Sequence, residues 1–181
     1  KELVEQISKK YNATFIPIDI LTEGTACTVL YARKYINNEY PLLIANSDQI
    51  VDIIIDDYIE DCNRRKLDGS ILCFKEPSRD PKWSYAQINN DNIVIDVKEK
   101  VAISDLATVG IYYFSKGQYF VDGVIDMIIS NDRVNNEFYT CPVYNYCIKE
   151  SKKIGVYVID KSQMHGIGTP EDLEKYLDII S

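Results

Sequence analysis

The sequence predicts an α/β fold in which helices flank a mixed, mainly parallel β-sheet. Three observations indicate this fold class. Helix-like and strand-like segments alternate through the first part of the chain. One of these segments, LLIAN, is a continuous apolar run of the kind found in parallel strands that are buried on both faces. The 181 residues contain no internal repeat and no linker, so we expect one domain spanning residues 1–181.

The spacing of apolar residues defines the elements of the first part. Leu3, Val4 and Ile7 recur at helical spacing, whereas the following ATFIPID reads as a strand. Thr22 is a candidate N-cap of the next helix, and Glu23 in its first turn suits the helix dipole. The expected order is a helix at 1–11, a strand at 13–19, a helix at 22–36, a strand at 42–46, a helix at 51–66 and a strand at 69–74.

The second part begins with a loop, EPSRDPKWS, which is rich in turn formers. YAQINNDNIVIDVKEK then has the pattern of a hairpin with its turn at Asn89 to Asn92. The last helix has Thr169 as its N-cap and Pro170 at its first position. The expected elements after the loop are a hairpin at 85–100, a strand at 107–115, a helix at 118–130, a helical segment within 137–149, a strand at 154–160 and a helix at 169–180.

Composition restricts the classes of partner. The formal net charge of −8 argues against binding to nucleic acid. The one dense basic spot, Asn63 to Lys66, reads as the solvated end of a helix or as a docking site. No apolar run is long enough to span a bilayer, and the first residues lack the apolar core of a signal peptide, so we expect no membrane partner. Five cysteines without a C-x-x-C pair and one histidine indicate reduced thiols in a cytoplasmic protein without a zinc site.

A small polar cluster follows the apolar run LLIA. It consists of Asn46, Ser47, Asp48 and Gln49. Ligands of open α/β sheets bind at the carboxyl ends of strands, and a carboxylate there is an oxygen ligand suited to Mg²⁺. The alternative is an ordinary loop in which Asp48 caps the next helix, since Asp is a favoured N-cap residue. The cluster by itself leaves both interpretations open.

Five segments in order give the chain a family resemblance: LTEGTACTVLYARKYI, PLLIANSDQ, VKEK, ATVGIYYF and GIGTPEDLEKY. Together they resemble the sugar-phosphate nucleotidyltransferases, the family of nucleoside-diphosphate-sugar pyrophosphorylases. The resemblance implies a Rossmann-like sheet of the nucleotidyltransferase and GT-A type. It also implies transfer of a nucleoside monophosphate from a nucleoside triphosphate to a sugar 1-phosphate or similar phosphorylated acceptor, with Mg²⁺ as cofactor and pyrophosphate as the second product.

The resemblance further implies roles for individual residues. Asp48 would be the metal ligand and, with Lys100, a catalytic residue. The nucleotide would be bound by Glu23, Gly24, Thr25, Ser47 and Asp48. The acceptor would be bound by Ser84, Tyr85, Ala86, Glu99, Lys100, Thr108 and His165. Trp83 either lines the acceptor pocket or anchors the loop by packing.

Two departures from the family pattern bear on activity. The glycine-rich segment that cradles the triphosphate has no match, so we expect the chain to be part of a longer protein and to bind the nucleotide poorly by itself. Gly166 stands where the family places a second metal-binding aspartate, with Asp52 and Asp160 as candidate substitutes. Two alternatives stay open, a GT-A-type glycosyltransferase and a catalytically inactive binding or assembly module. The nucleobase, the acceptor and the formation of a homo-oligomer are not identified by the sequence.

Overall fold

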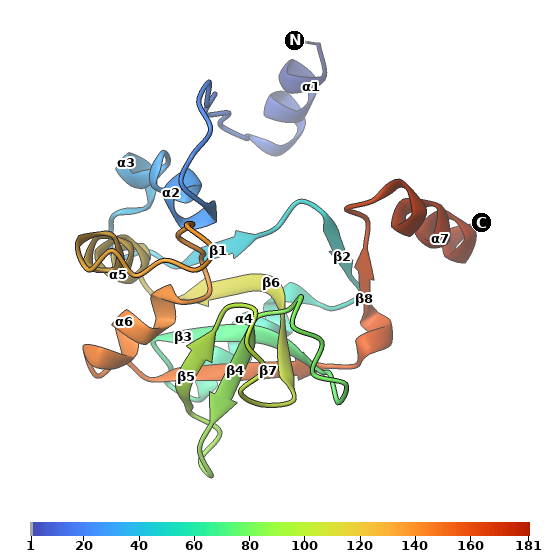
Figure 1. The fold of residues 1–181 in the computed structure, drawn as a ribbon. Coiled ribbons are helices and arrows are strands. Elements are labelled where there is room, and N and C mark those ends of the chain that lie inside the picture. Colours follow the sequence, from blue (N-terminus) through green and yellow to red (C-terminus); the bar gives the residue numbers. More distant parts are fainter. Residues whose placement is uncertain (1) are drawn as a thin grey trace.

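A mixed six-stranded β-sheet forms the centre of the fold (Figure 1). The computed structural model describes residues 2–181. The helices are α1 (Glu2–Tyr11), α2 (Thr25–Leu30), α3 (Arg33–Ile36), α4 (Ile55–Arg64), α5 (Gly117–Ile129), α6 (Val143–Lys149) and α7 (Pro170–Ile180), with a short 3₁₀ turn η1 (Lys161–Gln163). The strands are β1 (Leu42–Ala45), β2 (Gln49–Val51), β3 (Gly69–Lys75), β4 (Tyr85–Ile88), β5 (Val94–Lys98), β6 (Leu106–Phe114), β7 (Ile154–Ile159) and β8 (Met164–Gly166).

The strand β6 organises the sheet. The strand order is β5-β4-β6-β3-β7, and β1 also pairs with β6. β3 follows β6 along one edge, whereas β4 and β1 share the other edge, β4 at Ala107 and β1 at residues 111–114. Residues 108–110 of β6 therefore have no strand pairing on that second edge. This short gap is where the candidate site lies.

The mixed α/β fold is confirmed, although parallel pairing is confined to one pair of strands. Among residues 2–181, only β3 and β7 pair in parallel, and the other strand pairs of the sheet are antiparallel. Because β1, β3 and β4 are each antiparallel to β6, these three strands and β7 still run in one direction. The prediction that LLIAN is a buried parallel strand was wrong: β1 is antiparallel to β6, and Leu43 is 38% exposed.

The two faces of the sheet pack against different helices. Along β6, Leu106, Tyr112 and Phe114 belong to the core that faces α5 and α6. The alternate residues of the same strand belong to a second core that α4 covers with Tyr58 and Cys62. In Figure 1, α5 and α6 lie together on one side, and α4 lies behind the sheet. A strand buried on both faces explains why β6 has no exposed residue and reads as a long apolar run.

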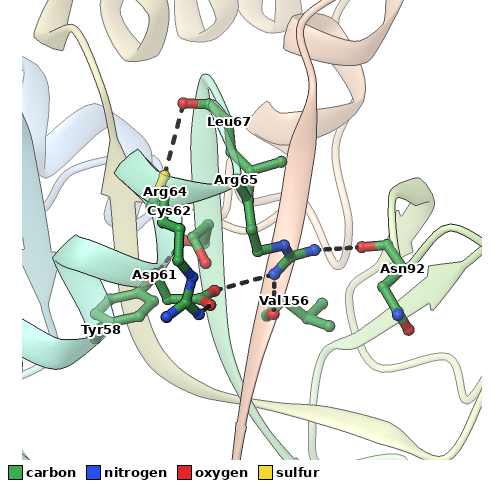
Figure 2. Close-up of polar contacts among 9 residues, drawn as sticks. Tyr58, Asp61, Cys62, Arg64, Arg65, Leu67, Asn92 and Val156 are labelled. Carbon is green, nitrogen blue, oxygen red and sulfur yellow. Dashed lines mark hydrogen bonds and ion pairs between the residues drawn. The ribbon is translucent and has the colours of Figure 1, made fainter.

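Arg65 fastens α4 to the sheet. Its guanidinium donates to the carboxylate of Asp61 at 3.1 Å, to the backbone oxygen of Val156 in β7 at 3.0 Å and to the backbone oxygen of Asn92 at 2.8 Å (Figure 2). These contacts join three segments that are distant in the sequence. The basic segment 63–66 was predicted to be the solvated end of a helix or a docking site. Neither interpretation describes Arg65, because its side chain is hydrogen-bonded within the protein.

Several predicted elements have the expected positions. The hairpin is β4 and β5, with its turn closed by a hydrogen bond from Asn92 N to Asn89 O. The last helix is α7, and Thr169 Oγ1 caps it by accepting from the backbone N–H of Asp172 at 3.2 Å. The helix predicted at 1–11 is α1, although Lys1 lies outside the described residues. In Figure 1, α1 stands away from the sheet.

Other predicted elements were wrong. Residues 13–19 are not a strand, because no other strand pairs with them, and Pro17 lacks the N–H that a ladder needs. The predicted helix 22–36 is two short helices, α2 and α3, and Gly24 rather than Thr22 is the N-cap of α2. The predicted helix 51–66 begins only at Ile55, because Val51 belongs to the strand β2, which pairs with β8.

The five cysteines are free thiols. Cys73 is fully buried, and burial raises its pKa. Within residues 2–181, no helix combines the length and the apolar character needed to cross a bilayer.

Candidate functional site

A cavity of about 200 Å³ opens beside the unpaired stretch of β6. Thr108, Gly110 and Tyr112 form its floor, since they alternate on one face of the strand. Its walls come from the loop after β1, the loop before β4, the end of β5 and residues 139–141. Four other hollows have larger volumes. Those between α5 and α6 and beside the β4–β5 hairpin contain none of the predicted site residues, one between α4 and β7 contains Asp52 and Asp160, and one beside α2 contains Glu23.

Gly110 allows the loop after β1 to approach the floor. Its φ of +91° lies in a region that residues with a side chain rarely adopt. A Cβ at this position would lie 2.5 Å from Asn46 Nδ2 and 2.8 Å from Gln49 Oε1. Asn46 N also donates to Gly110 O at 3.0 Å. Both polar side chains therefore lie directly over the glycine and line the cavity.

Glu99 brings a buried carboxylate to the cavity wall. Its residue is 8% exposed, and Ser84 Oγ donates a hydrogen bond to Glu99 Oε2. Burial raises the pKa of Glu99, and the hydrogen bond from Ser84 and the nearby charge of Lys100 offset part of this effect. A carboxylate held in this way is a ready acceptor for a ligand hydroxyl group.

Lys100 follows Glu99 at the end of the hairpin, in a turn with a φ of 57°. Its ammonium group donates to the hydroxyl of Tyr139 at 3.0 Å and lies 5.0 Å from the centre of that ring. The Tyr139 hydroxyl raises the pKa of Lys100. Since Tyr139 lines the cavity, a permanent positive charge is fixed at its border.

Thr108 and Thr25 lie on the cavity as well. Thr108 is 3% exposed, and its hydroxyl lies 3.3 Å from the hydroxyl of Tyr112. Thr25 Oγ1 accepts from both the backbone N–H and the hydroxyl of Thr140, at 3.1 and 3.0 Å. These bonds connect the start of α2 to the segment 139–141, which lies more than 100 residues later in the sequence.

Gly24 and Glu23 hold the backbone of Phe138. A Cβ on Gly24 would lie 2.4 Å from Phe138 O, so glycine is required by a close approach of two backbones. Glu23 O accepts from Phe138 N at 2.8 Å, and its carboxylate pairs with Arg133 at 2.5 Å. These contacts are made within the protein. They do not test the contacts of Gly24 and Glu23 with a nucleotide, which stay predictions.

Asp48 lies in the exposed loop between β1 and β2, together with Ser47. Its backbone oxygen accepts from Ile167 N at 2.8 Å, and its Oδ2 lies 3.2 Å from the place where Gly168 would carry a Cβ. The capping interpretation was wrong, because the next element is the strand β2 and the N-cap of α4 is Ile54. Asp48 therefore presents a free carboxylate at a strand end.

We tested whether these residues fit a magnesium ion. No group of three or more His, Cys, Asp or Glu side chains gathers anywhere in the described part of the chain, residues 2–181, so it offers no dedicated protein cage for a metal. Mg²⁺ is commonly held by one or two carboxylates together with phosphate oxygens of a substrate and water. The exposed carboxylate of Asp48 fits that second arrangement.

Gly166 takes the place of the second metal-binding aspartate of the family pattern. The candidate substitutes Asp52 and Asp160 bind other groups of the protein. His165 Nε2 lies 2.8 Å from Asp52 Oδ2, and its ring packs 5.2 Å from Tyr176 of α7. Asp160 accepts from Ser162 N and caps the 3₁₀ turn. Both candidate substitutes thus have other partners, and His165 does not line the cavity. No atom lies within 4 Å of a Cβ built on Gly166.

Not every predicted acceptor residue reaches the cavity. Tyr85 and Ala86 are fully buried in the two cores, and neither lines the site. The Tyr85 hydroxyl donates instead to Asp80 O at 2.7 Å. Because side chains alternate along a strand, the sequence WSYA could not show which of its members face the pocket.

Sequence reasoning missed several lining residues. Gln49 stands next to Asp48 in the polar cluster, so its position was a signal that could have been followed. Tyr139, Thr140 and Cys141 carry no comparable signal, since they reach the cavity through the packing of a long connection. Trp83 lines the cavity and also packs edge-on against Phe74 at 5.2 Å, so it is a packing anchor, and its contact with an acceptor stays a prediction.

The chain is similar to known proteins in its sequence and in its fold. The sequence model of a family described as nucleotidyl transferase matches residues 2–175. No curated protein matches the chain. Among solved structures, the fold is similar to a nucleoside-diphosphate-sugar pyrophosphorylase from Vibrio cholerae RC9, with a TM-score of 0.78 and 21% identity over 98% of this chain and 75% of that chain. It is also similar to a protein from Bacillus anthracis described as a glucose-1-phosphate thymidylyltransferase, with a TM-score of 0.71 and 16% identity over 98% of this chain and 70% of that chain.

Proposed function

Because the chain belongs to the nucleotidyl transferase family, we propose that it transfers a nucleoside monophosphate from a nucleoside triphosphate to a sugar 1-phosphate or similar phosphorylated acceptor. The segment 46–49, from the end of β1 to the first residue of β2, carries the proposal. Its residues Asn46 and Gln49 line the cavity, while Asp48 between them presents an exposed carboxylate. An acceptor in the cavity and a metal-bound triphosphate at Asp48 would then be neighbours.

The proposed reaction forms one bond and breaks one. A phosphate oxygen of the acceptor bonds to the α-phosphorus of the triphosphate, and the bond between that phosphorus and the oxygen bridging to the β-phosphate breaks. Pyrophosphate leaves with that oxygen. No covalent intermediate with the protein is needed, so catalysis depends on positioning and charge neutralisation. This accounts for a site without a nucleophilic triad.

The proposed reaction gives each of the following site residues a role that is consistent with its position. Glu99 would accept hydrogen bonds from acceptor hydroxyls, and Lys100 would offset the charge of the acceptor phosphate. Thr108 and Ser84 would shape the acceptor pocket. Asp48 would hold Mg²⁺, which when bound supplies positive charge to the phosphates. Glu23, Gly24 and Thr25 would face the nucleotide.

The test is pyrophosphate release by the full-length protein with a panel of nucleoside triphosphates and phosphorylated acceptors in the presence of Mg²⁺. Asp48→Asn keeps the size of the side chain and removes the charge. We expect it to lower turnover about a hundredfold or more, with thermal unfolding unchanged. Asp91→Asn, an exposed aspartate in the β4–β5 turn that does not line the cavity, is the matched control. Near-normal release by Asp48→Asn would contradict the assignment.

A catalytically inactive binding module is the second candidate. Two observations favour it, namely Gly166 in place of an aspartate and the lack, among residues 2–181, of a cluster of three metal-ligating side chains. Binding of triphosphate and acceptor without any pyrophosphate release would support this candidate.

A further inference from the structure

A neutral partner holds the ammonium group of Lys100 at the border of the cavity. Lys100 Nζ donates to the hydroxyl of Tyr139 at 3.0 Å and lies 5.0 Å from the centre of that ring. Within residues 2–181, Lys100 takes part in no ion pair. The hydroxyl of a tyrosine is uncharged at neutral pH, so it accepts a hydrogen bond without cancelling the positive charge. The contact therefore gives the ammonium group a direction and leaves its charge available to an anion.

Tyr139 is itself held by the residues on both sides of it. Phe138 O accepts from Ala26 N at 3.0 Å, and Thr140 N donates to Thr25 Oγ1 at 3.1 Å. Phe138 is 1% exposed and Thr140 is 5% exposed, so the backbone on each side of Tyr139 is packed against the fold. A tyrosine ring turns about few torsions, whereas a lysine ammonium ends a flexible four-carbon stem. The hydroxyl of Tyr139 is thus a fixed point to which the longer side chain of Lys100 is attached.

A lysine that is already ordered binds an anion at a smaller entropic cost. An exposed lysine side chain loses much rotamer freedom when a ligand fixes it, and this loss subtracts from the affinity. The hydrogen bond and the ring face of Tyr139 hold Lys100 in one arrangement before any ligand enters. An ammonium group has three N–H donors, and Tyr139 takes one of them. The other two remain for the oxygen atoms of a phosphate.

We propose that Tyr139 is a positioning residue, which acts on the phosphate of the acceptor through the ammonium group of Lys100. This inference rests on the proposed function and adds to it a residue that no motif of the sequence indicated. The hydroxyl and the ring of Tyr139 act differently, because the hydroxyl sets the direction of the ammonium group, whereas the ring face attracts a cation without fixing its orientation. Tyr139→Phe, which keeps the ring, therefore isolates the positioning by the hydroxyl.

The first measurement detects the hydrogen bond itself. The Tyr139 hydroxyl raises the pKa of Lys100, and the carboxylates of Glu99 and Glu137 add smaller contributions. We therefore expect a lower pKa of Lys100 in Tyr139→Phe, measured from the pH dependence of its Cε resonance in NMR. The resonance is assigned by its loss in Lys100→Ala. Tyr40→Phe, at an exposed tyrosine that does not line the cavity, is the matched control and should leave this pKa unchanged.

The second measurement concerns the anion. The full-length protein is titrated with inorganic phosphate and with glucose 1-phosphate, and binding is followed by the shift of the same Lys100 resonance. We expect Tyr139→Phe to weaken binding of both probes about fivefold to tenfold and to raise the acceptor KM in pyrophosphate release by a similar factor. Triphosphate affinity and thermal unfolding should be unchanged, and Tyr40→Phe should behave as the unaltered protein.

A double-mutant cycle shows whether Tyr139 acts through Lys100. Binding of glucose 1-phosphate is measured by calorimetry for Tyr139→Phe, Lys100→Ala and the variant that carries both changes. If Tyr139 acts only by placing the ammonium group, its hydroxyl has nothing to place once Lys100 is alanine. We therefore expect the double variant to bind as weakly as Lys100→Ala and no more weakly. An equal loss on removing the hydroxyl with and without Lys100 would overturn the inference.

The inference and the proposed function fail in different ways. An unchanged pKa of Lys100 and unchanged phosphate affinity in Tyr139→Phe would overturn the inference. The proposed function is judged separately by pyrophosphate release from the unaltered protein. Release with the same acceptor KM in Tyr139→Phe would retain nucleotidyl transfer and overturn the positioning role. Phosphate binding that depends on Tyr139 through Lys100, without release for any acceptor, would retain the positioning role and overturn transfer.

Discussion

Two carboxylates of the site have opposite environments. Asp48 is exposed at a strand end, whereas Glu99 is buried and has a raised pKa. An exposed carboxylate is suited to a hydrated metal ion, and a buried one to hydroxyl groups of a ligand whose hydrogen bonds replace those of water. The difference supports separate roles in the proposed function.

Substitution of Glu99 by glutamine should preserve the stability of the fold and weaken acceptor binding. A raised folded-state pKa means that the stabilisation is present below the usual pKa of 4.5 and is lost as the pH rises through the folded value. Glu99→Gln has no carboxyl group to titrate, so it does not lose this stabilisation as the pH rises. Its amide oxygen can still accept the hydrogen bond from Ser84. We expect its unfolding temperature to equal or exceed that of the unaltered protein at pH 7, with acceptor affinity about tenfold weaker. Lower stability at pH 7 with normal affinity would contradict this role.

Lys100 should act on the acceptor and not on the nucleotide. It borders the cavity beside Tyr139. Of the predicted nucleotide residues, Thr25 lines this cavity, whereas Glu23, Gly24, Ser47 and Asp48 do not. We expect Lys100→Ala to raise the acceptor KM or lower kcat about tenfold while leaving triphosphate affinity unchanged. Lys98→Ala, at the last residue of β5 and in an ion pair with Asp96, is the control. Loss of triphosphate affinity with normal acceptor use would reverse the assignment.

At the scale of helices and strands, the sequence predicted the features whose formation depends on neighbouring residues alone. The cap at Thr169, the turn at Asn89 to Asn92 and the apolar run of β6 are of this kind. Residues 13–19 have strand-like composition, yet a strand exists only if another strand pairs with it. The antiparallel pairing of β1 likewise depends on the insertion of β6, which no single segment of the sequence encodes.

Gly110 should be essential for the loop that carries Asp48. Gly110→Ala imposes a side chain at a φ of +91° and brings its Cβ within 3 Å of Asn46 and Gln49. We expect a loss of about 1 to 3 kcal/mol in the free energy of unfolding. Gly166→Ala in the paired strand meets open space and should cost far less. Equal unfolding midpoints for the two variants in denaturant would contradict this explanation.

An ion pair between the buried carboxylate of Glu76 and the exposed ammonium of Lys161 joins the loop before β4 to the turn after β7. The hydrogen bond from Lys161 Nζ, at 2.6 Å, and a second from Ser78 lower the pKa of Glu76 to about 2. Its stabilisation is therefore present above pH 4.5 and is lost as the pH falls toward 2. We expect Lys161→Met to move acid unfolding to higher pH, whereas Lys175→Met, from the exposed pair with Glu171 on α7, should not. Coincident acid-unfolding curves for both variants would exclude this role for the pair.

For the whole molecule, the site illustrates what sequence could and could not predict. Motifs indicated Asp48, Glu99, Lys100 and Thr108 separately, and the structure places three of them on or beside one cavity. The wall made by residues 139–141 was not predictable, because it is created by a long connection that packs back on α2 through Thr25. The side that a residue of β4 faces was also beyond sequence, since one position along a strand reverses the face.

The central claim is that the protein moves a nucleoside monophosphate onto a phosphorylated acceptor. The most direct measurement follows phosphorus from a triphosphate labelled at the α-position, with the full-length protein, Mg²⁺ and the acceptor panel. The account predicts the label in a product that joins nucleoside and acceptor through a diphosphate, with one unlabelled pyrophosphate released per product. Labelled nucleoside diphosphate, or label that stays in the triphosphate with every acceptor, would contradict the account.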